Sequence, residues 1–153
     1  MFGLFRGIIS AANPAYLAGE LAYQMKTVQD VYKVKAVIAH PSSLAVTQEA
    51  CKSAGLNTNM ICLIEDSPES QLPSINSLIK KHTQSRAPQA VKFRKGESKK
   101  KVAFLSFSSG TTGLPKAVMI SHYNVTSNVL QYNEFRKGRF IPGQSKSMAF
   151  LPL

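Results

Sequence analysis

The chain has 153 residues, of which 44% are hydrophobic, and it carries a net charge of +11. That length suits one domain, and the hydrophobic fraction is sufficient to build a core. The sequence excludes a disulfide framework, because it holds only Cys51 and Cys62, and a transmembrane helix, because no apolar stretch of about 18 residues occurs.

The chain begins with a predicted strand and helix. Residues 8–11 form the end of the strand, and in the helix that follows apolar residues recur at spacings of three and four, as on one helix face. That face comprises Leu17, Leu21, Met25, Val28 and Tyr32.

Two short buried strands are predicted next, over residues 36–39 and 60–64. The helix between them covers residues 44–54 and is closed by Gly55, because glycine readily adopts the left-handed conformation found at helix ends. This βαβαβ order predicts an α/β fold in which parallel strands carry helices over their faces. Residues 75–82 form a further short helix.

Residues 83–101 are polar and basic, and we expect a loop there. Residues 1–91 hold 8 basic and 6 acidic side chains whereas residues 92–153 hold 11 and 2, so +9 of the net charge falls in the second part. A solvated loop explains this segment; steering of an anionic substrate, or a patch for nucleic acid or a membrane surface, are the alternatives. Only Phe93 offers an aromatic ring for base stacking, so no nucleic-acid partner is expected. The basic run comprises Lys92, Arg94, Lys95, Lys99, Lys100 and Lys101.

Two apolar runs predict strands at residues 102–107 and 117–121, and the segment between them combines hydroxyls, glycines and a lysine. Glycines let the backbone approach a ligand, hydroxyls and N–H groups donate to phosphate oxygens, and lysine supplies positive charge. The composition therefore predicts a polyphosphate site. A Walker A loop is excluded, because Leu-Pro-Lys follows Gly113 and Ala117 follows Lys116. The candidate ligand-binding residues are Ser108, Ser109, Gly110, Thr111, Thr112, Gly113 and Lys116.

A helix is expected only after the second of these strands. It begins near Ser121 or His122 and carries Val125, Val129 and Tyr132 on one face. A phosphate loop between two strands differs from the strand–loop–helix arrangement of Walker and Rossmann sites.

The string SSGTTGLPK at 108–116, with the Ser121-His122-x-Asn124 element after it, resembles the phosphate-binding signature of the adenylate-forming (AMP-binding) enzymes. These include acyl- and aryl-CoA ligases, luciferases and peptide-synthetase adenylation domains. The 4-coumarate-CoA ligase and acyl-CoA ligase branch is the most similar. Residues 7–16, followed by Glu20-Leu21 and Gln24, resemble its early strand-to-helix segment, and residues 150–153 resemble a strand that leads into a substrate-pocket motif.

The resemblance implies a partial doubly wound sheet with flanking helices and a ligase reaction in two halves. A carboxylic acid attacks the α-phosphorus of ATP to give an acyl-adenylate and pyrophosphate, and a thiol, usually coenzyme A, then displaces AMP. The candidate residues would bind the β- and γ-phosphates. Mg²⁺ would be held mainly by phosphate oxygens and water, so neither a metal ligand nor a catalytic residue is assigned. The anionic substrate that the basic run would steer is then ATP or coenzyme A.

Relative to that family, residues 1–153 correspond to part of the N-terminal domain, truncated at both ends. The parts that hold adenine and ribose, shape the acyl pocket and supply a catalytic lysine have no counterpart. The competing hypothesis is a catalytically inactive product that binds nucleotide weakly or serves as an interaction module. Strand edges and core faces are expected to be exposed where missing strands would pack. The expected location is the cytoplasm, with the peroxisome as the alternative.

Leu17 stands where related ligases often have a threonine that caps the next helix and pairs with Glu20. We expect that cap to be lost and the helix to start at Asn13-Pro14. The two cysteines predict reduced, buried thiols. No histidine has an acidic or thiol partner at a catalytic or metal-binding spacing. His122 is expected to cap or hydrogen bond at a helix start.

Overall fold

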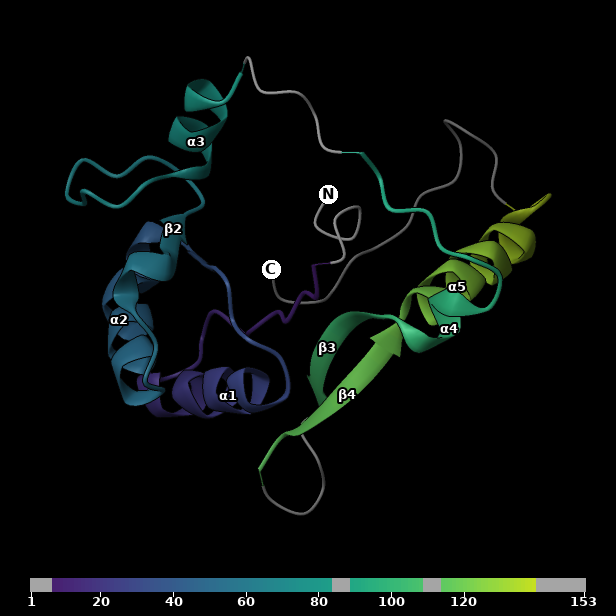
Figure 1. Ribbon diagram of the computed structural model, residues 1–153, viewed down its shortest axis with the longest axis horizontal. Coiled ribbons are helices and arrows are strands. Elements are labelled where there is room, and N and C mark those ends of the chain that lie inside the picture. The colour runs from purple at the N-terminus through teal and green to yellow at the C-terminus, as the bar shows by residue number, and fades with distance from the viewer. Residues whose placement is uncertain (1–6, 84–88, 109–113, 140–153) are drawn as a thin grey trace.

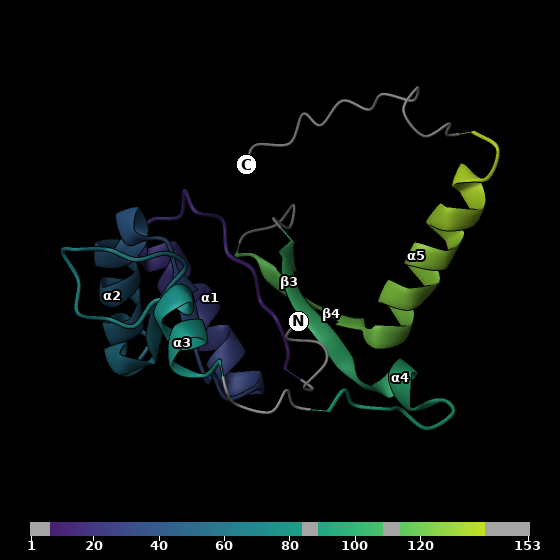
Figure 2. The ribbon, with the colours of Figure 1, turned by 90° about the horizontal axis from the view of Figure 1, so that it is seen from above.

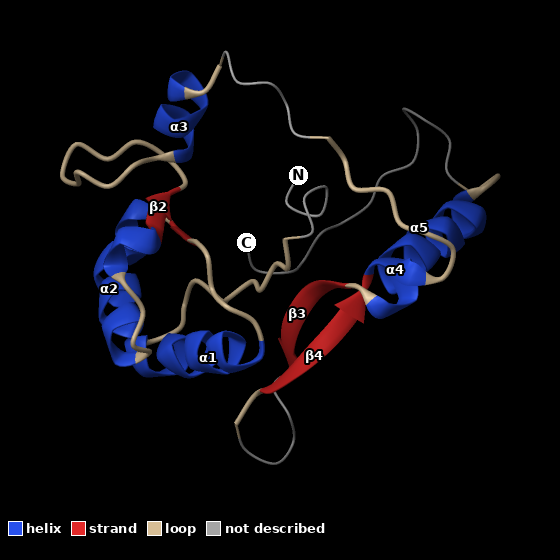
Figure 3. Ribbon diagram, viewed as in Figure 1, coloured by secondary structure: helices blue, strands red, loops and turns tan. Residues whose placement is uncertain are grey.

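The computed structural model describes residues 7–83, 89–108 and 114–139. Within these residues the strands form two pairs, β1 with β2 and β3 with β4. Figures 1 and 3 show the first pair with α1, α2 and α3 on one side of the molecule and the second pair with α4 and α5 on the other. The elements are α1 (Ala18–Val31), β1 (Val37–Ala39), η2 (Pro41–Ser43), α2 (Leu44–Ser53), η3 (Thr58–Met60), β2 (Ile61–Leu63), α3 (Ile75–Lys81), α4 (Glu97–Lys100), β3 (Val102–Ser108), β4 (Lys116–Ser121) and α5 (His122–Arg136).

The parallel βαβ unit predicted from residues 36–64 is confirmed. β1 and β2 pair in parallel, from Val37 opposite Ile61 to Ala39 opposite Leu63, and α2 connects them. The C-terminal end of α2 forms a Schellman motif, in which Gly55 has a φ of 69°. The Gly55 N–H donates to the Lys52 carbonyl at 3.1 Å and the Leu56 N–H to the Cys51 carbonyl at 2.8 Å.

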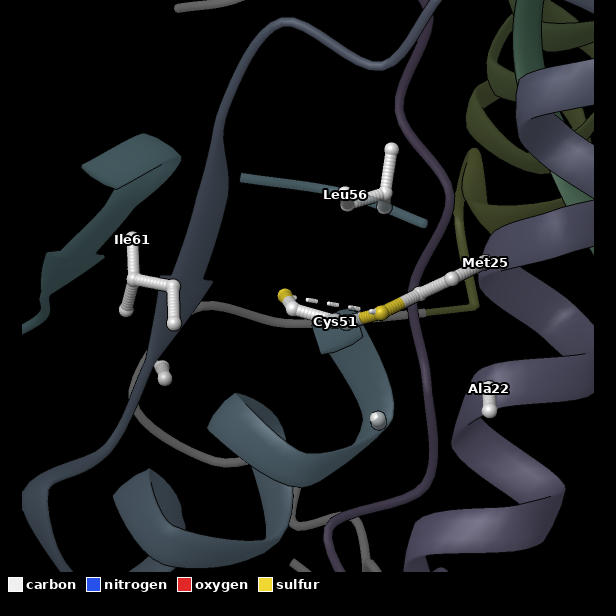
Figure 4. Packing of buried hydrophobic residues seen from close by; sticks show 7 residues of the cluster. Ala22, Met25, Cys51, Leu56 and Ile61 are labelled. Carbon is white, nitrogen blue, oxygen red and sulfur yellow. Dashed lines mark hydrogen bonds between the residues drawn. The ribbon is translucent and has the colours of Figure 1, made fainter. Parts of the chain in front are cut away.

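The main hydrophobic core joins α1 and α2 to this strand pair. Figure 4 shows Met25 of α1 pointing toward Cys51 of α2, whose thiol lies 3.8 Å from the Met25 sulfur. Both helices are amphipathic, so burying their apolar faces together stabilises the unit. The buried cluster comprises Ala22, Met25, Ala39, Ala50, Cys51, Leu56 and Ile61.

The strands β3 and β4 form an antiparallel hairpin, with Ser108 paired to Lys116 at one end and Val102 to Ser121 at the other. In place of the strand end expected at residues 8–11, the structure has a single bridge at Ile9, and it joins this hairpin and not β1. Ile9 bridges Phe104 in parallel: its N–H donates to the Ala103 carbonyl at 3.1 Å, and its carbonyl accepts from the Leu105 N–H at 2.9 Å. The segment before α1 therefore runs from the hairpin to the side of the molecule that holds α1, α2 and α3 (Figure 2).

The sequence predicts a loop over residues 83–101, but this basic stretch contains the short helix α4. α4 is one helical turn that follows Gly96, whose φ of 81° is left-handed. Its start is fixed by Glu97, whose carboxylate accepts from the Arg94 N–H at 3.0 Å. The local hydrogen bond outweighs the mutual repulsion of the neighbouring lysines.

α5 begins where it was predicted, at Ser121–His122, and its start is formed by a capping box at Ser121. The Asn124 N–H donates to the Ser121 hydroxyl at 3.2 Å, and the Ser121 N–H donates to the Asn124 side-chain oxygen at 3.0 Å. The apolar face expected on this helix is largely uncovered in the described part of the chain, because Val129 and Tyr132 are exposed. β4 is similarly open, with Val118 and Met119 exposed.

α1 starts four residues later than Asn13-Pro14, which corrects the predicted start. Asn13 instead closes a separate turn, since its side-chain oxygen accepts from the Ala15 N–H at 3.0 Å. Leu17 is the N-cap residue. The Glu20 carboxylate accepts from the Leu17 N–H at 2.9 Å, which is one half of a capping box. The other half is missing, because a leucine side chain has no acceptor.

Leu17→Thr is expected to complete that box. The threonine hydroxyl would accept from the N–H of Glu20. Replacing the leucine removes little buried apolar surface, because Leu17 is 72% exposed. The free energy of unfolding should rise by about 1 kcal/mol, as measured by urea denaturation. Leu17→Val is the matched control, since valine has the shape of threonine without the oxygen. An equal gain in both variants would show that the cap is not the cause.

Candidate functional site

The predicted phosphate-binding segment, residues 108–116, connects β3 to β4 in the sequence. β3 ends at Ser108 and β4 begins at Lys116, so the two strands expected on either side of the segment are confirmed. Ser109, Gly110, Thr111, Thr112 and Gly113 lie outside the described residues, as do residues 150–153. Ser108 and Lys116 are direct cross-strand partners, so the hairpin brings together the two described members of the predicted set.

Lys116 is exposed, and within the described residues no carboxylate pairs with its ammonium group. An exposed and unpaired lysine keeps its full charge available for an anion, because no internal salt bridge has to be broken first. Ser108 is also exposed, so its hydroxyl lies on the accessible end of the hairpin. The strand ends therefore present one hydroxyl and one positive charge together.

Helix α1 reaches the same end of the hairpin. The Tyr23 hydroxyl donates to the Pro115 carbonyl at 3.2 Å, across 92 positions of sequence. Between the helix and the hairpin lies a hollow of about 270 Å³. The side chain of Gln24 is fixed at its wall: the amide nitrogen donates to the Ala11 carbonyl at 2.9 Å and to the Ser10 hydroxyl at 3.0 Å. The hollow is lined by Tyr16, Gly19, Glu20, Tyr23, Gln24, Phe107, Leu114 and Pro115.

The basic run lies at the opposite end of the hairpin. The His122 N–H donates to the Lys101 carbonyl at 2.9 Å, which joins the end of the run to the start of α5. From Lys101 to Ser108 the strand spans about 20 Å, which is more than two Debye lengths at physiological salt. The end of the run at Lys101 is therefore separated by a strand length from Ser108 and Lys116, the two described members of the predicted set.

Two aromatic side chains, one on the run and one on α5, contact neighbouring side chains. The Phe93 ring lies 4.8 Å from the His122 ring, between centroids, and the Lys99 ammonium lies 4.8 Å from the centre of the Tyr123 ring. His122 is the first residue of α5 and Ser121 is its cap, so the ring of His122 has a packing role. The sequence predicted a capping or hydrogen-bonding role for His122 at the helix start. The cap is Ser121 instead, whereas the hydrogen bond is made by the His122 N–H, and the ring contact was not predicted.

His40 has an acidic partner, contrary to the sequence-based expectation. Its Nε2 lies 3.2 Å from a Glu65 carboxylate oxygen, and its Nδ1 lies 2.7 Å from the Ser42 hydroxyl. The residues meet because His40 follows β1 and Glu65 follows β2, and parallel strands end at the same edge. The imidazole and carboxylate are 55% and 59% exposed, so bulk water weakens the pair. The Ser42 N–H also donates to Nδ1, which makes His40 the cap of η2.

The two cysteines are free thiols, as predicted. Cys51 is buried and Cys62 is half-buried, and burial raises the pKa of both thiols above the ordinary value. A raised pKa leaves little thiolate at neutral pH, which makes both poor nucleophiles. Their role is packing.

The described residues form neither a candidate metal centre nor a membrane-spanning helix. No group of three or more His, Cys, Asp and Glu side chains there is placed to hold a metal ion. Among the described helices, none combines the length and the apolar character needed to cross a bilayer.

Comparison with a family model matches residues 4–153 to the AMP-binding enzyme family. An acyl-CoA ligase of Alternaria alternata is 28% identical over 96% of this chain and 25% of its own length. Acyl-CoA synthetase 7 of Caenorhabditis elegans is 34% identical over 76% of this chain and 20% of its own. The 4-coumarate-CoA ligase of Pinus taeda is 32% identical over 81% and 20%. The chain thus spans about a quarter or less of the length of these curated relatives.

Solved structures that share the fold of this chain include a CoA ligase and a luciferase. The anthranilate CoA ligase AuaEII, in complex with anthranoyl-AMP, superposes with a TM-score of 0.66 at 22% identity, over 86% of this chain and 24% of its own. A red-emitting luciferase of Phrixothrix hirtus gives 0.66 at 20% identity, over 84% and 30%. The expected α/β fold, a partial sheet with flanking helices, is confirmed by this likeness.

Proposed function

The chain belongs to the AMP-binding enzyme family, and we propose that its 108–116 segment binds the β- and γ-phosphates of ATP. The observation that carries the proposal is the pairing of Ser108 with Lys116 where β3 ends and β4 begins. It places a hydroxyl beside a positive charge that has no carboxylate partner among the described residues. Ser109, Gly110, Thr111, Thr112 and Gly113 connect the two strand ends in the sequence and complete the proposed site.

The reaction that this site serves is the activation of a carboxylic acid by ATP. Negative charge develops on the pyrophosphate as the carboxylate oxygen attacks the α-phosphorus and the bond to the β-phosphate oxygen breaks. Donors already placed around the leaving group stabilise that charge, by about 3–4 kcal/mol for each donor in a water-poor site. Lys116 supplies the full positive charge among them. Mg²⁺ enters with the nucleotide as MgATP.

The acid is an aryl or fatty acid and the acceptor thiol is coenzyme A. Support for this substrate class comes from the curated relatives, which are named as acyl-CoA and 4-coumarate-CoA ligases. Two free cysteines fit a protein of a reducing compartment, and of these we propose the cytoplasm, with the peroxisome as the alternative.

For this chain alone we propose phosphate binding and not complete adenylation. It spans 25% of the Alternaria alternata ligase, so most of the relative's residues have no equivalent in it. The same observation favours the second candidate function, a module that binds nucleotide without catalysis. The two candidates share the phosphate site and differ in whether pyrophosphate is released.

Titration of the chain with MgATP, magnesium pyrophosphate and AMP tests the proposal. A site for the β- and γ-phosphates should bind MgATP and pyrophosphate with similar affinity and AMP at least about tenfold more weakly, because AMP lacks both groups. Addition of aryl and fatty acids with labelled pyrophosphate then separates the two candidates, since only a catalytic chain forms labelled ATP. AMP binding as tight as MgATP would refute the phosphate site.

A further inference from the structure

Tyr23 connects α1 to the peptide unit that precedes Lys116. The acceptor of its hydroxyl is the Pro115 carbonyl, at 3.2 Å. That carbonyl and the Lys116 N–H belong to one planar peptide unit, so fixing the oxygen also fixes the plane from which Lys116 continues. The hydrogen bond therefore acts directly on the backbone of the proposed phosphate-binding lysine.

Because residue 115 is a proline, the hydrogen bond from Tyr23 is sufficient to fix the direction of the Pro115 carbonyl. The ring of Pro115 locks φ near about −65°, which leaves ψ as the soft dihedral of that residue. The ψ angle decides where the carbonyl points, and the Tyr23 hydroxyl restrains that direction. On its other side Lys116 is held by its pairing with Ser108. Lys116 is thus restrained both by β3 and by α1.

The Tyr23 phenol is carried by α1, which is anchored in the main core. Tyr23 lies between Ala22 and Gln24, both buried, and Met25 of the same helix is part of the main core. The Thr27 hydroxyl donates to the Tyr23 carbonyl at 2.9 Å, within a regular turn of α1. A half-buried phenol on a helix fixed by the core is held more precisely than one on a loop.

We propose that Tyr23 is a positioning residue, which orients the Pro115–Lys116 peptide unit so that the Lys116 ammonium faces a bound polyphosphate. The proposal rests on the proposed function, because it assigns Tyr23 to the same site. Tyr23 itself touches no phosphate. It acts by raising the fraction of molecules in which Lys116 is correctly placed, and apparent affinity falls as that fraction falls.

Tyr23→Phe removes only the hydroxyl, and α1 offers a matched control. The Tyr32 hydroxyl also joins α1 to the hairpin, but its partner is the Met119 sulfur in the middle of β4, at 3.7 Å. Tyr23→Phe should raise the dissociation constant for MgATP about three- to tenfold, the range expected for loss of one hydrogen bond. Tyr32→Phe should change it less than about twofold, because its bond does not reach the Lys116 peptide unit.

Nuclear magnetic resonance of the ligand-free chain supplies a readout that a general loss of stability would not produce. A hydrogen bond to the Pro115 carbonyl polarises the peptide unit, so Tyr23→Phe should shift the Lys116 amide resonance while Tyr32→Phe leaves it in place. An unmoved Lys116 resonance in Tyr23→Phe would overturn the proposal, as would unchanged MgATP affinity in that variant.

Lys116→Ala, measured in parallel, separates the positioning role of Tyr23 from the phosphate site itself. If Lys116→Ala loses affinity and Tyr23→Phe does not, the positioning role is wrong and the phosphate site remains. If the unsubstituted chain and Lys116→Ala bind MgATP equally, or neither binds, the proposed function fails and the role of Tyr23 fails with it.

Discussion

Lys116→Ala is expected to raise the dissociation constant for MgATP about 10- to 100-fold, because a hydrogen bond to a charged group contributes about 1.5–3 kcal/mol. The lysine is the first residue of β4, and it is exposed and has no carboxylate partner among the described residues. Its removal therefore breaks no described ion pair and should leave the free energy of unfolding nearly unchanged. Isothermal titration and urea denaturation measure the two quantities.

Lys95→Ala is the control for this variant. It removes the same charge from an exposed position in the basic run, which ends at Lys101, a strand length from Ser108 and Lys116. At physiological salt the expected change in affinity is less than about twofold, since screening suppresses interactions over that distance. Equal losses in Lys95→Ala and Lys116→Ala would mean that net charge attracts the nucleotide and that Lys116 has no special place.

Ile61→Ala is expected to lower the free energy of unfolding by about 3 kcal/mol, because it leaves a cavity at the centre of the βαβ unit. Ile61 is 1% exposed and belongs to the cluster that joins α1, α2, β1 and β2. A domain is stable by only about 5–15 kcal/mol, so this single change removes a large part of the total. Urea denaturation followed by circular dichroism measures it.

Ile38→Ala is the matched control on the neighbouring strand. Ile38 is 42% exposed, and the same truncation there should cost about 1 kcal/mol because less apolar surface is buried. Should Ile61→Ala fail to fold, Ile61→Val gives a smaller cost of about 1 kcal/mol that can still be measured. Equal costs for Ile61→Ala and Ile38→Ala would contradict the placement of the core.

Local signals in the sequence were sufficient for much of the fold. Gly55 marks the end of α2 because the left-handed conformation it adopts is costly for other residues. The start of α5 was predictable from Ser121 and Asn124, which form its capping box. The start of α1 was not predictable, because both Asn13 and Leu17 could begin the helix. The hydrogen bond from the Leu17 N–H to the Glu20 carboxylate stabilises the later start.

The contacts that were not predictable depend on residues far apart in the chain. Glu65 meets His40 only because β1 and β2 run in parallel and end at one edge. Tyr23 meets Pro115 only because α1 packs at the end of the hairpin where β4 begins. In the sequence Tyr23 lies off the apolar face of its helix, and its hydroxyl has no partner at helical spacing. The candidate site was therefore predictable as a motif, but its support from α1 was not.

The central claim is that residues 108–116 bind the terminal phosphates of ATP. Amide resonances of the isotope-labelled chain, recorded with MgATP, pyrophosphate and AMP, test it most directly. We expect MgATP and pyrophosphate to shift resonances of residues 108–116 while AMP leaves them unchanged. Shifts confined to the basic run at residues 92–101, or equal shifts of residues 108–116 with AMP, would contradict it.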